Sequence, residues 1–114
     1  MQDTLDRLMA EVHQRTREMP PESYTTKLIE GGVPKMGSKI LEEAQEVVDA
    51  AEKAAPDSNG HLDNEHLVYE ACDLIYHLWV LLGSRGVSVD DLRLELQRRE
   101  GTSGLEEKRL RPQK

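Results

Sequence analysis

Hydrophobic residues recur along this chain at helical rather than strand spacing. Near the start, Leu5, Leu8, Met9 and Val12 follow the i, i+3, i+4, i+7 pattern of a helix that buries one face. Comparable patterns return further along, and no segment alternates with period two over the length of a strand. The pattern predicts helices over about residues 3–20, 33–54, 64–82 and 88–100, and a short helical turn over residues 23–28.

Capping and turn residues mark the ends of these helices. Asp3 can cap the first helix, two prolines end it, and Ser88 with Asp91 forms a variant capping box at the start of the fourth. Four helices with short connections predict an all-α, four-helix bundle-like fold. We expect one domain over residues 1–114, with a polar and basic tail from about residue 105 that is frayed.

The composition excludes several classes of protein. The 114 residues carry 15 Lys and Arg against 22 Asp and Glu, a net charge of −7, whereas a general nucleic-acid-binding protein needs a basic surface. A single cysteine excludes an intrachain disulfide. The apolar segment 67–82 is interrupted by Glu70, Asp73 and His77, so it is too polar to span a bilayer. We therefore expect a soluble, cytoplasmic protein without nucleic-acid or membrane partners.

The second predicted helix carries acidic and basic side chains beside its apolar face. On a wheel of about 100° per residue, Glu43 lies at the edge of the apolar arc and Glu46 lies one turn further. Lys39 and Lys35 follow the same side toward the start of the helix, while Glu42 lies on the outer flank. Glu43 is therefore the carboxylate that we expect nearest the core.

The third predicted helix is apolar around nearly its whole circumference, which is typical of a helix buried on most sides. Four polar residues nevertheless share one narrow stripe: His66, Glu70, Asp73 and His77. Carboxylates are rarely buried unless they are paired or bind a metal. The stripe therefore needs a partner.

Two partners are compatible with the sequence. In the first alternative, Lys39 or Lys35 pairs with the acidic residues, and His77 pairs with Asp73. In the second, a divalent cation neutralises four carboxylates that repel one another on facing helices. All-oxygen ligands favour Mg²⁺ or Mn²⁺ over Zn²⁺, and a carboxylate site with open positions usually serves phosphates, to which the two lysines would add charge. The four predicted metal ligands are Glu43, Glu46, Glu70 and Asp73.

Further side chains of the third helix have a structural as well as a functional interpretation. His66 and His77 are either ligands or acid–base groups, or else hydrogen-bonded structural residues. Trp79 and Ile75 either face a partner helix or pack the core of the monomer. Cys72 is interpreted as a small core residue.

Several stretches resemble a known enzyme family. Glu42-Glu43-x-x-Glu46 followed by Glu70-x-x-Asp73 resembles the metal motif of the MazG-like all-α nucleoside triphosphate pyrophosphohydrolases. The narrower resemblance is to the phosphoribosyl-ATP pyrophosphatases, and it covers about residues 3–109. It rests on Ser23-Tyr24-Thr25, Gly31-Gly32-Val33-x-Lys35, Lys39-x-x-Glu42-Glu43-Ala44, Tyr76-His77 and residues 99–108.

The resemblance implies an enzyme of histidine biosynthesis that hydrolyses phosphoribosyl-ATP, with Mg²⁺, to phosphoribosyl-AMP and pyrophosphate. It also implies a homodimer or a dimer of dimers whose helices pack across subunits. In the mechanism that we expect, Glu42 orients the attacking water, Lys35 and Lys39 bind phosphate oxygens, and Lys108 and Arg109 add contacts from the tail. Two rivals remain: a house-cleaning pyrophosphohydrolase of the same superfamily that removes non-standard nucleotides, and a non-catalytic helical oligomer with a salt-bridged stripe.

Overall fold

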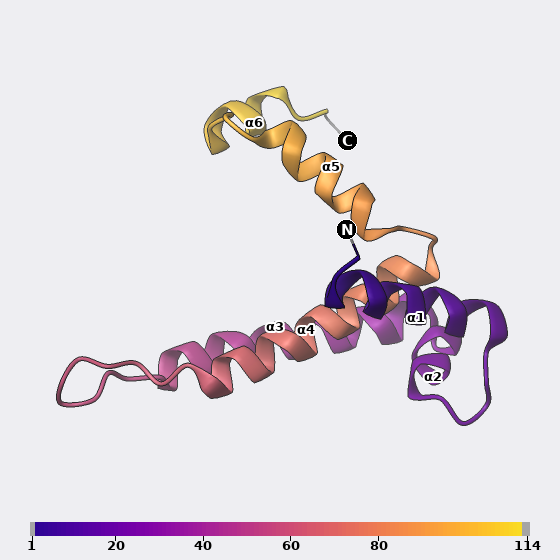
Figure 1. Cartoon of the computed structure of the whole chain (residues 1–114), viewed down its shortest axis with the longest axis horizontal. Helices are drawn as coiled ribbons and strands as arrows, with labels where there is room; N and C mark the ends of the chain where they lie inside the picture. Colours follow the sequence, from indigo (N-terminus) through magenta and orange to yellow (C-terminus); the bar gives the residue numbers. More distant parts are fainter. Residues whose placement is uncertain (1, 113–114) are drawn as a thin grey trace.

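A computed structural model describes residues 2–112, and within that range every regular element is a helix. This confirms the predicted all-α class. Figure 1 shows α3 and α4 as a long antiparallel hairpin, with α1 and α2 packed at one end of it and α5 and α6 projecting away. The helices are α1 (Thr4–Glu18), α2 (Tyr24–Glu30), α3 (Gly32–Lys53), α4 (Glu65–Ser84), α5 (Val89–Arg99) and α6 (Gly104–Leu110).

The hydrophobic core lies at the end of the hairpin that α1 and α2 cover. It joins side chains from five helices, which explains why the apolar stripes recur along the sequence. Its buried members are Met9, Val12, Leu28, Met36, Trp79, Val80 and Val89.

Trp79 packs this core rather than a partner helix. Its side chain is buried, and its Nε1–H donates a hydrogen bond of 3.0 Å to the backbone carbonyl of Leu5 on α1. Ile75, one turn earlier, packs against the same core. Of the two interpretations left open by the sequence, packing within the monomer is therefore the one observed.

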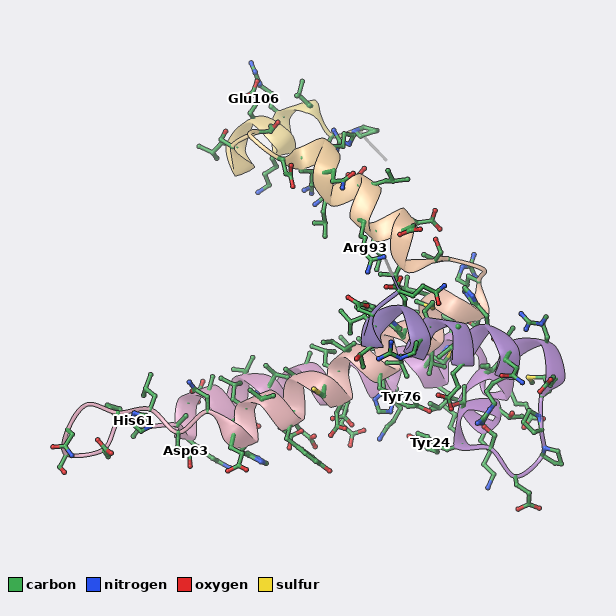
Figure 2. All side chains as sticks on the ribbon, viewed as in Figure 1. Tyr24, His61, Asp63, Tyr76, Arg93 and Glu106 are labelled. Atoms are coloured by element: carbon green, nitrogen blue, oxygen red, sulfur yellow. The ribbon has the colours of Figure 1, made fainter. Side chains whose placement is uncertain are left out.

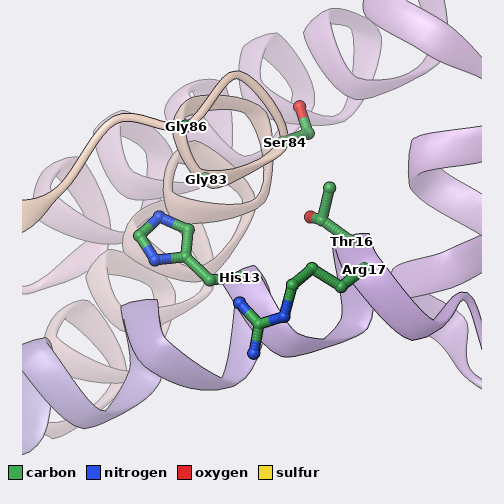
Figure 3. A pocket seen from close by; sticks show the side chains of 6 residues that line it. All are labelled: His13, Thr16, Arg17, Gly83, Ser84 and Gly86. Carbon is green, nitrogen blue, oxygen red and sulfur yellow. The ribbon is translucent and has the colours of Figure 1, made fainter.

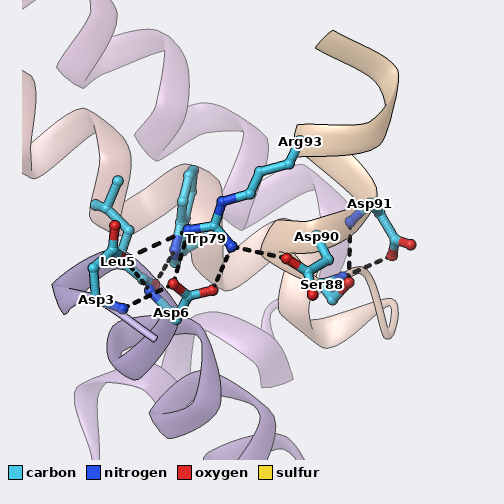
Figure 4. Close-up of polar contacts among 8 residues, drawn as sticks. All are labelled: Asp3, Leu5, Asp6, Trp79, Ser88, Asp90, Asp91 and Arg93. Carbon is cyan, nitrogen blue, oxygen red and sulfur yellow. Dashed lines mark hydrogen bonds and ion pairs between the residues drawn. The ribbon is translucent and has the colours of Figure 1, made fainter. Parts of the chain in front are cut away.

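The predicted caps of α1 and α5 are present, and an ion pair near them connects the two helices. Asp3 with Asp6 and Ser88 with Asp91 form capping boxes at the starts of α1 and α5. Arg93 on α5 donates hydrogen bonds of 2.8 Å to both carboxylate oxygens of Asp6, which lies on α1 (Figure 4). The guanidinium holds the pKa of Asp6 well below its usual range. This ion pair bridges α1 and α5, two helices far apart in sequence.

Two expectations about single segments are wrong. The tail expected to be frayed contains the helix α6, because Ser103 caps it by accepting a hydrogen bond from the backbone N–H of Glu106. Residues 113–114 of that tail lie outside the described range. Cys72, expected in the core, is exposed.

The predicted burial of α4 on most sides holds only for its C-terminal half. The N-terminal half packs against α3, but Val68 and Tyr69 are exposed in the single chain because α1 and α2 lie at the opposite end of the hairpin (Figure 1). Among the described residues, no helix is long and apolar enough to cross a membrane.

Candidate metal centre

Three carboxylates meet where α3 packs against α4. Glu43 and Glu46 lie one turn apart on α3, and Glu70 reaches them from α4. One ligand oxygen from each residue lies within 4.8 Å of the other two. Glu43 is only 7% exposed and Glu70 only 9%, as expected for Glu43 from its place beside the apolar arc.

Two oxygens of this group have no hydrogen-bond partner. Oε2 of Glu43 and Oε2 of Glu70 are buried, and no donor among the described residues reaches them. Burying an unpaired acceptor is costly, and burying an unpaired charge costs more. The pair of orphaned oxygens therefore fits a cation, whose coordination would satisfy both of them.

The salt-bridge alternative does not account for the two unpaired oxygens: Nε2 of His66 lies 3.4 Å from Oε1 of Glu70, which leaves Oε2 of Glu70 without a partner. Lys39 Nζ lies 3.1 Å from Oε2 of Glu42, on the outer flank of α3. Lys35 is exposed, and its aliphatic chain lies against Gly31. Nδ1–H of His77 donates a hydrogen bond of 2.8 Å to the backbone carbonyl of Asp73 rather than to its carboxylate. Neither lysine is thus the observed partner of the buried oxygens.

The crowding of these groups changes their proton affinities. Burial, together with the neighbouring carboxylate of Glu46, raises the pKa of Glu43 to about 7 from an ordinary value of 4.5. Burial and Glu46 also raise the pKa of Glu70. Like charges at such short range cannot all remain ionised at low cost unless a cation joins them.

Asp73, the fourth predicted ligand, lies at the margin of the cluster. It is half-buried, and its charge contributes to the raised pKa of both Glu43 and Glu70. Its carboxylate is nevertheless outside the group of three whose oxygens converge. The structure thus brings three of the four predicted ligands together and places the fourth nearby.

The other predicted site residues lie further out. Glu42 is exposed and paired with Lys39, so α3 turns it away from the three converging carboxylates. Lys108 and Arg109 lie on α6, which projects away from the hairpin (Figure 1). Within one chain these two basic residues do not approach the cluster.

The sequence analysis singled out Tyr24, Thr25 and Tyr76 only as motifs of the resemblance, and it did not predict that they contact one another or His77. The Tyr24 hydroxyl, at the start of α2, lies 3.3 Å from Nε2 of His77 on α4, and the hydroxyls of Thr25 and Tyr76 are 2.6 Å apart. His77 was singled out by its place in the polar stripe, and its hydrogen bonds confirm the structural interpretation of that residue. Its contact with Tyr24 spans 53 residues, so helical spacing carried no signal for it.

A separate hollow of about 380 Å³ lies between α1 and the C-terminal end of α4. Figure 3 shows His13 and Arg17 of α1 on one side of it and the turn at Gly83 and Gly86 on the other. His13 is already engaged, because its Nε2 lies 2.9 Å from the backbone carbonyl of Val87. The hollow contains none of the predicted site residues.

An all-α chain in which one helix of a hairpin carries Glu-x-x-Glu and the other carries Glu-x-x-Asp has the features of a MazG-like nucleoside triphosphate pyrophosphohydrolase. Enzymes of this class typically need a divalent metal ion, and the carboxylate cluster is the candidate site for it. The family model for phosphoribosyl-ATP pyrophosphohydrolase matches residues 5–100, and the chain belongs to this family.

Relatives support the same assignment. The chain is 52% identical to the phosphoribosyl-ATP pyrophosphatase of Rhodopirellula baltica over 96% of its own length and 88% of that protein. It is 47% identical to the phosphoribosyl-ATP pyrophosphatase of Erythrobacter litoralis, over 96% of this chain and 97% of the relative. It is also 46% identical to the histidine biosynthesis bifunctional protein HisIE of Bacteroides thetaiotaomicron, over 81% of this chain and 41% of that longer protein.

Proposed function

We propose that this chain hydrolyses phosphoribosyl-ATP to phosphoribosyl-AMP and pyrophosphate, the second step of histidine biosynthesis. Family membership and the names of the relatives support the substrate and the pathway. The observation that carries the chemistry is the pair of buried, partnerless carboxylate oxygens on Glu43 and Glu70, two residues whose carboxylates converge where α3 packs against α4.

Glu43, Glu46 and Glu70 would hold Mg²⁺, with Asp73 as a fourth ligand, and Mn²⁺ suits the same all-oxygen set. When bound, the cation clamps phosphate oxygens and offsets the charge that develops on the leaving pyrophosphate. The buried carboxylates supply the negative charge that retains it, and their raised pKa values make that retention depend on pH.

The basic residues of α3 bind the phosphates in this proposal. Lys39 now holds Glu42, and a phosphate that binds Lys39 competes with that ion pair. The released Glu42 carboxylate can then orient the attacking water, while the exposed Lys35 binds a further phosphate oxygen. Lys108 and Arg109 would have to reach the site of a second subunit, since α6 points away from its own.

We also propose that the chain forms a homodimer or a dimer of dimers. Large apolar side chains are exposed along the α3–α4 hairpin, and burying them against another copy would remove them from water. They are Leu41, Val48, Val68 and Tyr69. The expected cytoplasmic location stays a prediction.

The test is to incubate the purified chain with phosphoribosyl-ATP, with and without Mg²⁺, and to assay phosphoribosyl-AMP and pyrophosphate. We expect release of both products that depends on Mg²⁺ and falls by at least about 100-fold in Glu70→Gln, because a ligand is lost. Glu52→Gln, the same substitution at an exposed position of α3, is the matched control and keeps full activity.

The other outcomes separate the rivals. Release of pyrophosphate from deoxynucleoside triphosphates but not from phosphoribosyl-ATP would contradict the role in histidine biosynthesis and support a house-cleaning pyrophosphohydrolase. Absence of turnover on every nucleotide, with no effect of Mg²⁺ on the melting temperature, would support the non-catalytic oligomer.

A further inference from the structure

Aromatic residues are scarce in this chain, which has three tyrosines and one tryptophan, yet two of the tyrosines lie together beside His77, one helical turn beyond Asp73. The rings of Tyr24 and Tyr76 are stacked, with centroids 6.3 Å apart and planes 16° apart. The imidazole of His77 stands edge-on to both. Figure 2 shows Tyr24 and Tyr76 side by side where α2 meets the hairpin.

Hydrogen bonds hold the Tyr24 ring in place. Nδ1 of His77 lies 2.8 Å from the carbonyl of Asp73, which can only accept, so this nitrogen carries the hydrogen. In the neutral ring Nε2 then accepts the hydrogen bond of 3.3 Å from the Tyr24 hydroxyl. His77 itself is buried. The hydroxyl end of Tyr24 is thus tied to a side chain that cannot move freely.

Tyr24 as a whole residue is nevertheless half exposed to solvent. Tyr24 is 50% exposed, although one side of its ring lies over Tyr76. A large aromatic ring that is fixed along one edge and open on one face is the kind of surface on which a nucleobase stacks.

The histidine that holds the Tyr24 ring lies on the same helix as two of the candidate metal ligands, Glu70 and Asp73. His77 follows Asp73 by one turn and Glu70 by two turns, which places it about 10 Å along α4 from Glu70. Lys39 interacts with Tyr24 as well as with the carboxylates of α3: its hydrogen bond to Glu42 raises the pKa of its ammonium most, and Tyr24 and Glu43 add to that rise. A nucleotide with its phosphates at the carboxylates can therefore extend its base toward Tyr24.

We propose that the open face of Tyr24 stacks on the purine base of the nucleotide substrate, a role that rests on the proposed function. Tyr69 provides a comparison, because it is exposed near Glu70 and stacks on His66, with planes 10° apart. The His66 side chain is 71% exposed, whereas His77 is buried and hydrogen-bonded at both nitrogens. Tyr24 is therefore the better-fixed platform of the two.

The experiment compares two ligands that differ in whether they carry a base. Calorimetric titrations with Mg²⁺ measure the binding of α,β-methylene-ATP, which resists hydrolysis, and of inorganic tripolyphosphate. Tyr24→Leu is expected to weaken binding of the nucleotide analogue by about 5- to 150-fold, the range for losing one stacked base. The same variant should change the affinity for tripolyphosphate by less than about twofold. Tyr24→Phe keeps the ring and most of the affinity, and Glu52→Gln, at an exposed position of α3, is the control that leaves both ligands unchanged.

Equal weakening of both ligands by Tyr24→Leu would overturn the proposal, as would a loss specific to the base in Tyr69→Leu alone. Wild-type protein that binds tripolyphosphate as tightly as the analogue would overturn it too. This proposal can fail independently of the proposed function. If the chain hydrolyses phosphoribosyl-ATP but Tyr24→Leu binds the analogue as wild type does, only the stacking role of Tyr24 is wrong. If Tyr24→Leu weakens binding of the analogue selectively but the chain does not hydrolyse phosphoribosyl-ATP, the stacking role is supported and only the proposed reaction is wrong.

Discussion

Glu42 and Glu43 are neighbours in the chain, yet α3 turns one toward solvent and the other toward α4. Glu42 forms an ion pair with Lys39, whereas Glu43 is buried beside Glu46 and Glu70 with one oxygen unpaired. Two carboxylates within one turn of helix therefore have different electrostatic environments, because only Glu43 is both buried and surrounded by other negative charges.

Stability without divalent cation should fall as the pH rises. The pKa of Glu43 is raised to about 7 in the folded chain from 4.5, so the folded chain binds more protons than the unfolded chain between these values. Deprotonation of Glu43 therefore lowers the free energy of unfolding as the pH rises from 4.5 to about 7. In EDTA, Glu43→Gln is expected to flatten this dependence and to melt several degrees above wild type at pH 8.

The measurement is thermal unfolding between pH 5 and pH 8, in EDTA and in millimolar Mg²⁺. We expect Mg²⁺ to raise the melting temperature of wild type at pH 8 and to leave that of Glu43→Gln nearly unchanged. Glu52→Gln should behave as wild type throughout. Parallel pH profiles for wild type and Glu43→Gln would contradict the raised pKa.

At the scale of helices, the contact between α1 and α4 depends on a residue without a side chain. A Cβ atom added to Gly83 would lie 2.5 Å from Cγ1 of Val12 and 3.0 Å from Sδ of Met9. Both neighbours belong to the buried core, so neither can move away without opening it. Gly83 thus permits the close approach of α1 that covers Trp79 and Val80.

Gly83→Ala is expected to lower the free energy of unfolding by about 1–3 kcal/mol, the usual cost of overpacking a core. Gly37→Ala is the matched control on α3, where an added Cβ meets nothing within 4 Å. There the same substitution should raise stability by about 0.5–1 kcal/mol through helix propensity. Urea denaturation of both variants measures the difference, and equal effects would refute the close packing at Gly83.

At the scale of the whole molecule, the single chain is extended and leaves apolar surface uncovered. Its radius of gyration is 17.1 Å, against about 13 Å for a compact domain of similar length. Leu41 on α3 is 74% exposed, and Val68 and Tyr69 are exposed on α4. An elongated shape with an open apolar hairpin is what one subunit of an assembly would present.

We therefore expect light scattering to give a mass of at least twice the 12.9 kDa of one chain. Leu41→Glu should weaken the association by at least about 100-fold, because a charge would have to be buried at the interface. Leu62→Glu, at an exposed apolar position in the loop between α3 and α4, should leave the mass unchanged. A monomeric wild type at micromolar concentration would contradict the assembly.

Most of the helices could be predicted from the sequence because the features that define a helix are local in the chain. Capping boxes, glycines and prolines mark helix ends within a few residues, and apolar spacing identifies the buried face. The spacing of three between Glu43 and Glu46 likewise places both on one side of α3 without any tertiary information. The helix α6 was missed because its seven residues contain only two leucines, Leu105 and Leu110, which are too few to form an apolar stripe.

By itself the sequence determined the all-α class, the capped helices, the acidic motifs on α3 and α4, and the resemblance to a pyrophosphohydrolase family. Only the tertiary structure decided which carboxylates converge, that Lys39 pairs with Glu42, and that Tyr24 meets His77 across 53 residues. It also decided that Trp79 packs the core and Cys72 does not. The reason is that helical periodicity defines the face on which a residue lies, whereas the neighbour of that face depends on how distant helices pack.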